Sequence, residues 1–181
     1  MTTQLYSSLI ELIEALCGEQ FASVERPRIR AMVNSRAKRA YRQCEYWPRF
    51  FKAGEERAVT SGLIAYEQAG EQTIDTFLNI YRGNPYYQSD SPQYSFHLDS
   101  SGAHLVIGST VVETAFVAYK AVCGFNYGDS GDQDPLIPDE WFEYLAHGTY
   151  SDFLRSEGQT EKAVVADAEA REKLDDELLR I

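Results

Sequence analysis

Apolar residues recur at three- and four-residue intervals near the N-terminus. This spacing puts them on one side of a helix, which we predict over residues 4–17. Gly18 follows directly, and a glycine is the usual residue just past the end of a helix. The residues that carry the pattern are Leu5, Leu9, Leu12, Ile13 and Leu16.

A second amphipathic pattern extends from Arg26 to Cys44 and predicts a basic helix. Pro27 falls in its first turn, where proline is tolerated. Pro48 ends the helix at or before Trp47, and the neighbouring aromatic residues are expected to fill an edge of the core. The narrow apolar face consists of Ile29, Val33, Ala37, Ala40 and Cys44. Cations cover the remainder of the helix: Arg30, Lys38, Arg39 and Arg42.

The middle of the chain has a different pattern, rich in β-branched and aromatic residues. Within residues 93–99 the apolar and polar positions alternate strictly, which is typical of a strand with one exposed face. "DSSG" at 99–102 suits a hairpin turn, and "GNP" at 83–85 ends the strand before it. Residues 53–72 fit no firm pattern and are expected to form a loop or a short strand that leads into the sheet. The predicted strands are 73–82, 93–99, 103–108 and 110–122.

Two more helices are predicted at the C-terminal end. The first begins at Pro138 and has aromatic residues along one side, with Glu143, His147 and Ser151 opposite. Gly148 costs roughly 1 kcal/mol relative to alanine within a helix, so another backbone is expected to approach it closely. The second helix, over about 160–180, is mostly charged and acidic.

These elements predict an α+β protein: a helical bundle of two N-terminal and two C-terminal helices with an inserted antiparallel β-sheet of about four strands. Residues 1–52 and 137–181 are expected to form the helical core, and residues 53–136 the β insertion.

Charge is unevenly distributed along the chain. The net charge is −11, which argues against general affinity for nucleic acid. Residues 26–52 nevertheless hold nine Lys or Arg and one acid, a net charge of +8, so the remainder carries −19. Three explanations of the basic helix stay open: it neutralises the acidic C-terminal helix of its own chain, docks on an acidic partner, or contacts DNA. Its excess charge is larger than one neighbouring helix needs, which favours contact between copies of the protein.

The sequence contains neither a membrane-spanning segment nor a recognisable metal-binding motif. No apolar run reaches the roughly 20 residues that span a bilayer, and Glu11 and Glu14 interrupt the N-terminal apolar region, unlike a secretory signal. The three cysteines are far apart, without a CxxC pair or a histidine at ligand spacing. Cys17, Cys44 and Cys123 are therefore interpreted as small buried residues in a reducing cytoplasm, and no metal or cofactor is expected.

"GDSGD" at 128–132 resembles the serine loop of trypsin-like proteases. That chemistry needs a histidine base, for which His97 and His104 are the candidates, and a much larger β structure. Three aspartates in the same loop are possible Ca²⁺ ligands, but their spacing does not match an EF-hand. We therefore interpret the segment as a Gly/Asp-rich turn. The three aspartates are Asp129, Asp132 and Asp134.

No P-loop, GxGxxG, HExxH or GxSxG motif occurs. His147, on the polar side of its helix, is expected to be solvated or to lie at an interface. Paired-carboxylate glycosidase chemistry stays open because acids are plentiful, but nothing distinguishes any two of them. The sequence therefore predicts no catalytic residue and no enzyme activity.

The layout as a whole resembles the head-to-tail adaptor (connector) proteins of tailed bacteriophages. The resemblance covers about residues 5–181 and rests on helix order and patterning. It includes a basic helix, an "NPYYQ" turn in a β insertion, a proline-initiated helix with a small residue near its middle and an "EGQTEKA" corner, and an acidic last helix. The matching helical segments are "RAMVNSRAKRAYRQCEYW" (30–47), "IPDEWFEYLAHGTYSDFLRSEGQTEKA" (137–163) and "DAEAREKLDDELLRI" (167–181).

The resemblance implies a structural protein of the virion, located at the head–tail junction and assembled in the host cytoplasm. It implies a homo-oligomeric ring, usually a dodecamer, that binds the portal protein and a tail or nozzle protein. Genomic DNA would pass through the ring without specific binding, and no membrane would be involved.

In such a ring, the basic helix is expected to meet the acidic helix of the neighbouring copy. The candidates for the ring interface are Arg30, Arg36, Lys38, Arg39, Arg42, Trp141, Tyr144 and Gly148. The candidates for docking on portal or tail are Leu174, Leu178 and Ile181. Two alternatives remain: a small hydrolase that uses the loop 128–134, and a monomeric module that binds a basic partner.

Overall fold

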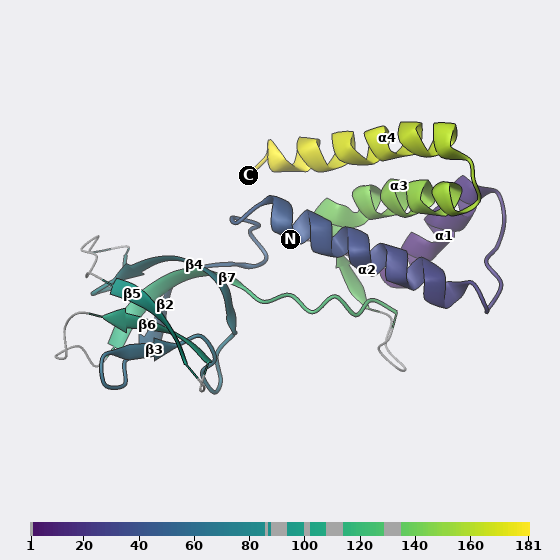
Figure 1. The fold of residues 1–181 in the computed structure, drawn as a ribbon. Coiled ribbons are helices and arrows are strands. Elements are labelled where there is room, and N and C mark those ends of the chain that lie inside the picture. Colours follow the sequence, from purple (N-terminus) through teal and green to yellow (C-terminus); the bar gives the residue numbers. More distant parts are fainter. Residues whose placement is uncertain (1, 86, 88–93, 100–101, 108–113, 129–134) are drawn as a thin grey trace. The chain divides into compact units, whose positions relative to one another are not determined.

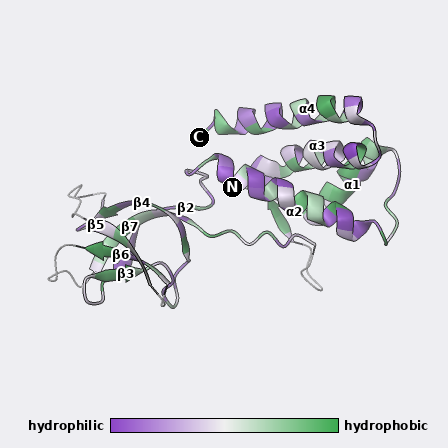
Figure 2. Cartoon of the chain, in the orientation of Figure 1, coloured by the Kyte–Doolittle hydropathy of each residue, from purple (hydrophilic) through white to green (hydrophobic). Residues whose placement is uncertain are grey.

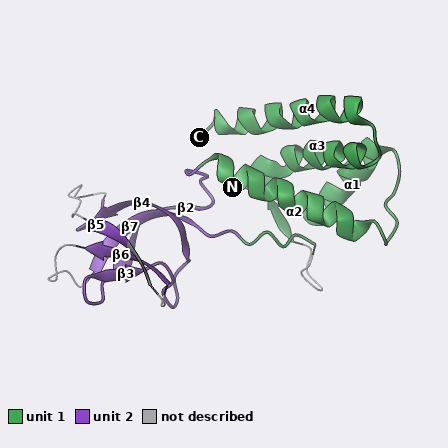
Figure 3. Cartoon of the chain, viewed as in Figure 1, with its two compact units in different colours: residues 1–44, 124–181 green, residues 45–123 purple. Residues whose placement is uncertain are grey.

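The computed structural model describes residues 2–85, 87, 94–99, 102–107, 114–128 and 135–181. The chain divides into two compact units, a helical unit of residues 1–44 and 124–181 and a β unit of residues 45–123 (Figure 3). The expectation of four helices with antiparallel β structure is confirmed among the described residues.

The unit boundaries differ from those that the sequence predicts, 52/53 and 136/137, because the connecting segments belong to the other unit. Phe50 accepts a hydrogen bond from the backbone of Ala121, which attaches residues 45–52 to the β unit. On the return, the Tyr127 amide donates to the side chain of Asn34 at 2.9 Å, and the Asn34 amide donates back to the Tyr127 carbonyl at 3.3 Å. The chain has therefore rejoined the helical unit well before residue 137.

The helical unit is organised around its third helix. α3 packs against each of the other three helices, and Figure 1 shows it between α2 and α4. Because α3 is covered on several sides, it is buried over most of its circumference, unlike a surface helix with a single apolar stripe. The helices are α1 (Tyr6–Cys17), α2 (Arg26–Gln43), α3 (Asp139–Ser156) and α4 (Thr160–Leu178).

Local signals end and begin these helices as predicted. Gly18 has a left-handed φ of 76°, and its amide donates to the Glu14 carbonyl at 2.9 Å, so it terminates α1. Pro138 directly precedes α3. Two short strands that the sequence did not reveal, β1 (Thr3–Leu5) and β8 (Leu136–Pro138), pair antiparallel and bring the N-terminal segment to the start of α3.

The β unit contains two three-stranded antiparallel sheets, ordered β2–β7–β4 and β3–β6–β5, rather than the single sheet of about four strands that was predicted. Of the two additional strands, β3 and most of β2 come from residues 53–72, the stretch without a firm sequence pattern. The strands are β2 (Phe51–Ala58), β3 (Leu63–Ala65), β4 (Ile74–Tyr81), β5 (Tyr94–Asp99), β6 (Gly102–Ile107) and β7 (Thr114–Ala121).

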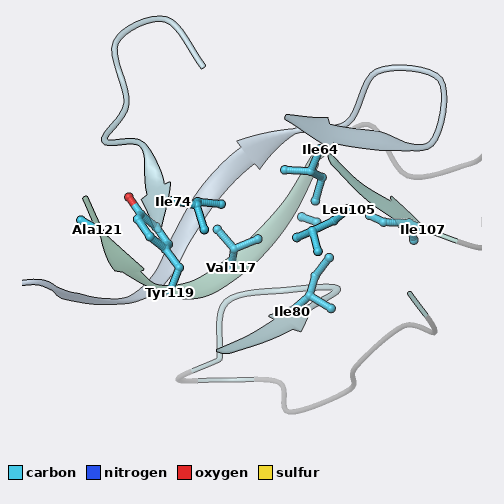
Figure 4. Close-up of a cluster of buried hydrophobic side chains, with 9 residues drawn as sticks. Ile64, Ile74, Ile80, Leu105, Ile107, Val117, Tyr119 and Ala121 are labelled. Atoms are coloured by element: carbon cyan, nitrogen blue, oxygen red, sulfur yellow. The ribbon is translucent and has the colours of Figure 1, made fainter. Parts of the chain in front are cut away.

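One buried cluster joins the two sheets. It draws on β3 and β6 from one sheet and on β4 and β7 from the other, so their inner faces share a core (Figure 4). Its members are Ile64, Ile74, Ile80, Leu105, Ile107, Ala115, Val117, Tyr119 and Ala121.

The helices carry polar residues along their length, as the hydropathy colouring of α2 and α4 in Figure 2 shows. In the described part of the chain, none of them combines the length and the apolar character that crossing a bilayer requires.

Candidate functional site

A single buried cation connects three helices of the helical unit. Arg36 on α2 is only 2% exposed. Its Nε and Nη2 atoms donate to the two carboxylate oxygens of Asp152 on α3 at 2.8 and 2.7 Å, and Nη1 donates to Asp167 on α4 at 2.7 Å. This forked geometry is one that arginine makes and lysine does not. Arg36 therefore serves the fold of its own chain.

Gly148 provides the space that Arg36 occupies. A Cβ atom added at Gly148 would lie 3.0 Å from Arg36 Cδ and 3.2 Å from Arg36 Nε. The sequence-based expectation that another backbone approaches this glycine is therefore wrong, because the neighbour is the arginine side chain.

Asp167 is the acidic centre of this network. Besides Arg36, it contacts Arg171 at 2.8 Å and Arg155 at 3.6 Å. Burial alone would raise the pKa of Asp167, but the hydrogen bond and charge of Arg36, with the charges of Arg171 and Arg155, outweigh burial and hold the pKa below its usual value. Burial likewise opposes the charge of Arg36, but its hydrogen bonds to Asp152 and Asp167 raise its pKa. Arg36 and Asp167 are therefore both charged at neutral pH.

The side of α3 predicted to be polar is the side on which α4 lies. Glu143 contacts Lys173 at 2.8 Å, and His147 Nδ1 lies 3.2 Å from Glu169. One turn further along α3, the buried Ser151 hydroxyl donates to the Ala163 carbonyl at 2.7 Å. These contacts fix an antiparallel register between α3 and α4.

Half of the predicted ring-interface residues are inside the helical unit, so they do not offer a surface to another copy. Trp141 is fully buried and Tyr144 is 4% exposed, because the aromatic side of α3 packs into its own core. Arg36 and Gly148 are buried for the reasons given above. Of the predicted docking residues, Leu174 is buried, Leu178 is half-buried and Ile181 is exposed.

The other four predicted ring-interface residues, all on α2, are at least partly exposed. Arg30 is half-buried and donates to the Gly128 carbonyl at 3.2 Å. Arg39 and Asp175 line the same depression of about 380 Å³ between α2 and α4, so Arg39 faces its own acidic helix. Lys38 and Arg42 are exposed and form no ion pair with any residue that the structure describes.

The exposed side of α2 forms what we call the basic face. It is directed away from the apolar residues Ile29, Val33, Ala37 and Ala40, which are buried. Arg28 at one end contacts Glu157 at 3.3 Å, with both side chains nearly half exposed. The basic face consists of Arg28, Ala31, Ser35, Lys38 and Arg42.

α4 has a corresponding exposed side, the acidic face; the sequence predicted an acidic helix here but did not identify these residues. It lies opposite the buried residues Ala163, Ala166, Ala170 and Leu174. Among the described residues, its acids form no ion pair. The acidic face consists of Glu161, Val165, Ala168, Glu172 and Asp175. Its three- and four-residue spacing is visible in the sequence and could have revealed it.

Most of the groups considered for catalysis lie outside the described residues. Ser130 and Asp132 lie outside those residues, as does the side chain of His97, and no group of His, Cys, Asp and Glu suited to a metal ion occurs within them. Burial, helped by nearby acids, raises the pKa of the Cys17 thiol to about 12, and burial raises that of Cys123 to about 11. Both thiols are therefore protonated and poorly nucleophilic at neutral pH.

No protein-family model matches this chain, and no curated protein matches it.

Proposed function

We propose that this chain is a structural protein that assembles with copies of itself into a ring, and that the ring joins the portal of a tailed bacteriophage to its tail. The observation that supports self-association best is the pair of oppositely charged, exposed faces on α2 and α4 of one helical unit. α3 lies between these helices, and the two faces lie opposite the buried sides of α2 and α4, although Arg28 also contacts Glu157 at the end of α3. A second copy can therefore meet each face.

A contact between two different faces is heterologous, and such contacts generate a closed ring when the rotation between neighbours divides a full turn. The copy number of twelve, the location at the head–tail junction of the virion, and the portal and tail or nozzle partners come from the resemblance. In this proposal the protein has no catalytic role.

The charge balance suits a conduit for DNA. With a net charge of −11 the chain repels DNA, so that a genome passing through the ring slides without adhering. The basic face is the main exception, and in this proposal it is covered by the neighbouring copy.

The test is assembly on a portal. The purified chain, alone and mixed with a purified portal ring, is analysed by size exclusion with light scattering and by negative-stain imaging. We include the portal because it can be needed to start assembly. The expected result is a portal particle extended by a symmetric ring of many copies. A chain that stays monomeric and does not bind the portal would overturn the proposal.

The hydrolase alternative has its own test in the loop 128–134. Replacing Ser130 with alanine or Asp132 with asparagine is expected to leave phage infectivity nearly unchanged, because the sequence predicts a turn there, and a turn does not depend on either side chain for chemistry. A large loss of infectivity from variants that still assemble would favour an enzymatic role instead.

A further inference from the structure

The basic and acidic faces have the spacing of helix–helix seams. Along α2 the residues of the basic face follow at intervals of three, four, three and four, and along α4 those of the acidic face follow at four, three, four and three. Positions repeated in this way form one continuous stripe along a helix and pack against the matching stripe of another helix. All ten residues are exposed, and Val165 at 61% is a large apolar side chain without cover.

The direction in which the two faces would meet follows from contacts within one copy. α2 runs antiparallel to α3, because Arg28 contacts Glu157 while Arg36, further along α2, contacts the earlier Asp152. α4 also runs antiparallel to α3, because Glu143 contacts Lys173 while Ser151 contacts the earlier Ala163. α2 and α4 therefore run in the same direction. The rotation that relates neighbours in a many-membered ring is small, so α2 of one copy and α4 of the next also run nearly parallel.

In parallel register, every position of one face meets a suitable residue of the other. The ends carry the cation–anion pairs Arg28 with Glu161, Lys38 with Glu172, and Arg42 with Asp175.

The residues at the centre of the seam are uncharged and, apart from Val165, have small side chains. Ala31 meets Val165 and Ser35 meets Ala168, so the helices can approach closely and cover the exposed valine. The antiparallel alternative places Lys38 against Val165 and Ala31 against Glu172, which leaves both charges without a partner.

We propose that the seam between neighbouring copies is a parallel helix pair, in which the basic face of α2 docks on the acidic face of α4 of the next copy. This rests on the proposed function, since it needs copies that associate head to tail. It adds to that function the two surfaces, their direction and their register.

The first experiment reverses one face at a time. The basic-reversed variant carries Lys38→Glu and Arg42→Glu, and the acid-reversed variant carries Glu172→Lys and Asp175→Lys. Each alone presents like charges at two of the three charged pairs of every seam, so each is expected to lose assembly on the portal while circular dichroism shows an unchanged fold.

Mixing the two variants is the decisive step. The negative α2 of one variant then meets the positive α4 of the other, and the reverse holds at the next seam. Alternating copies should restore the ring. A single chain that carries all four substitutions should also assemble by itself.

Matched controls reverse the same number of charges elsewhere on the helical unit. Glu11→Lys with Glu19→Lys matches the acid reversal, and Arg26→Glu with Lys162→Glu matches the basic reversal. All four residues are exposed and form no ion pair with a described residue. These controls are expected to assemble like the wild type.

Register is tested by cysteine cross-linking. A chain with Ala31→Cys and Val165→Cys should form a ladder of disulfide-linked oligomers on oxidation, because parallel docking puts these positions opposite each other. A chain with Lys38→Cys and Val165→Cys, which are opposite only in antiparallel docking, should not. The wild type with its own three cysteines is the baseline.

The outcomes separate this inference from the proposed function. If the wild type does not assemble on the portal, the proposed function fails and the seam fails with it. If the wild type assembles but the reversed variants also do, or if mixing does not restore assembly, the ring stands and this seam is overturned. A ladder from the antiparallel cysteine pair would overturn the parallel register.

Discussion

At the scale of single residues, the contact between Arg36 and Gly148 is the clearest case of one side chain determining which residue fits at another position. A buried guanidinium is costly unless its donors are satisfied, and here Asp152 and Asp167 satisfy three of them. The guanidinium cannot move away from Gly148 without breaking those hydrogen bonds. Position 148 therefore needs a residue without a side chain, although α3 as an isolated helix would be more stable with alanine there.

The first prediction is a reversal of sign in a double-mutant cycle. In the wild type, Gly148→Ala should lower the free energy of unfolding, because the added Cβ lies 3.0 Å from Arg36 Cδ and displaces a guanidinium that Asp152 holds. In an Arg36→Ala background the obstacle is gone, so the same change should raise stability by up to about 1 kcal/mol, the helix preference for alanine. Urea unfolding of the four proteins measures both effects. Equal effects in the two backgrounds would show that Arg36 does not explain the glycine.

The second prediction concerns acid stability. The pKa of Asp167 is held below its ordinary value in the folded chain, because the hydrogen bond and charge of Arg36 outweigh burial. Its stabilising effect is therefore complete above the unfolded pKa of about 3.9 and is lost as the pH falls through the lower, folded pKa. Unfolding free energies measured from pH 7 to acid should converge between the wild type and Asp167→Asn as the pH drops below about 4. A gap that stays constant through this range would contradict this account.

At the scale of elements, α4 attaches to the rest of the helical unit largely through small side chains. Ala163, Ala166 and Ala170 are buried against the rest of the unit, and the Ser151–Ala163 hydrogen bond lies in the same contact between α3 and α4. Alanines bury little area, so the fit depends on close approach of the two helices rather than on large side chains.

The third prediction follows from this close approach. Ala166→Leu should destabilise the chain by about 1–3 kcal/mol, because Ala166 is buried in the α3–α4 contact and the larger side chain would overpack it. Ala168→Leu is the matched control on the exposed side of the same helix and should stay within about 0.5 kcal/mol of the wild type. Both are measured by chemical unfolding, with hydrogen exchange reporting whether α4 loosens first. Equal losses in the two variants would show that the α3–α4 contact is not close-packed at Ala166.

The helices could be predicted from the sequence because their signals are local. Apolar spacing, the glycine after α1 and the proline before α3 all act within a few residues. β2 could not be predicted in this way, because it is charged and contains Gly54 at a φ of 68°, where its pairing with β7 shifts register. That segment is a strand because it pairs with β7, which is distant in the sequence, and a bulge accommodates Gly54 in the pairing.

The candidate site was predictable only in part, for the same physical reason. The exposure of Lys38 and Arg42 follows from their place opposite the apolar stripe of α2. Arg36 borders that stripe, and its partners Asp152 and Asp167 are more than a hundred positions away, so no local pattern separates it from the exposed cations. Trp141 was expected at a surface because the sequence does not reveal how many helices cover α3.

At the scale of the whole molecule, the uneven charge distribution is the property that relates the fold to the proposed assembly. A strongly acidic chain retains one basic face, and much of that face has no partner among the described residues of the same copy. Exposed ion pairs contribute little individually, about 0–1 kcal/mol each, so a single seam is weak. A closed ring multiplies such seams, which makes assembly sensitive to any condition that weakens all of them together.

The last prediction is therefore a dependence on salt. Raising sodium chloride from about 0.1 M to about 1 M shortens the screening length from about 10 Å to about 3 Å, which should shift the wild type from portal-bound rings towards monomers. The chain with both faces reversed should respond in the same way, because it has the same number of attractive pairs. Unfolding of the monomer should change much less, since its central pairs around Arg36 are buried. Light scattering across the salt series follows assembly, and urea unfolding at each end follows stability. If rings persist or grow at high salt, apolar surface rather than charge holds the copies together, because salt does not weaken apolar contacts.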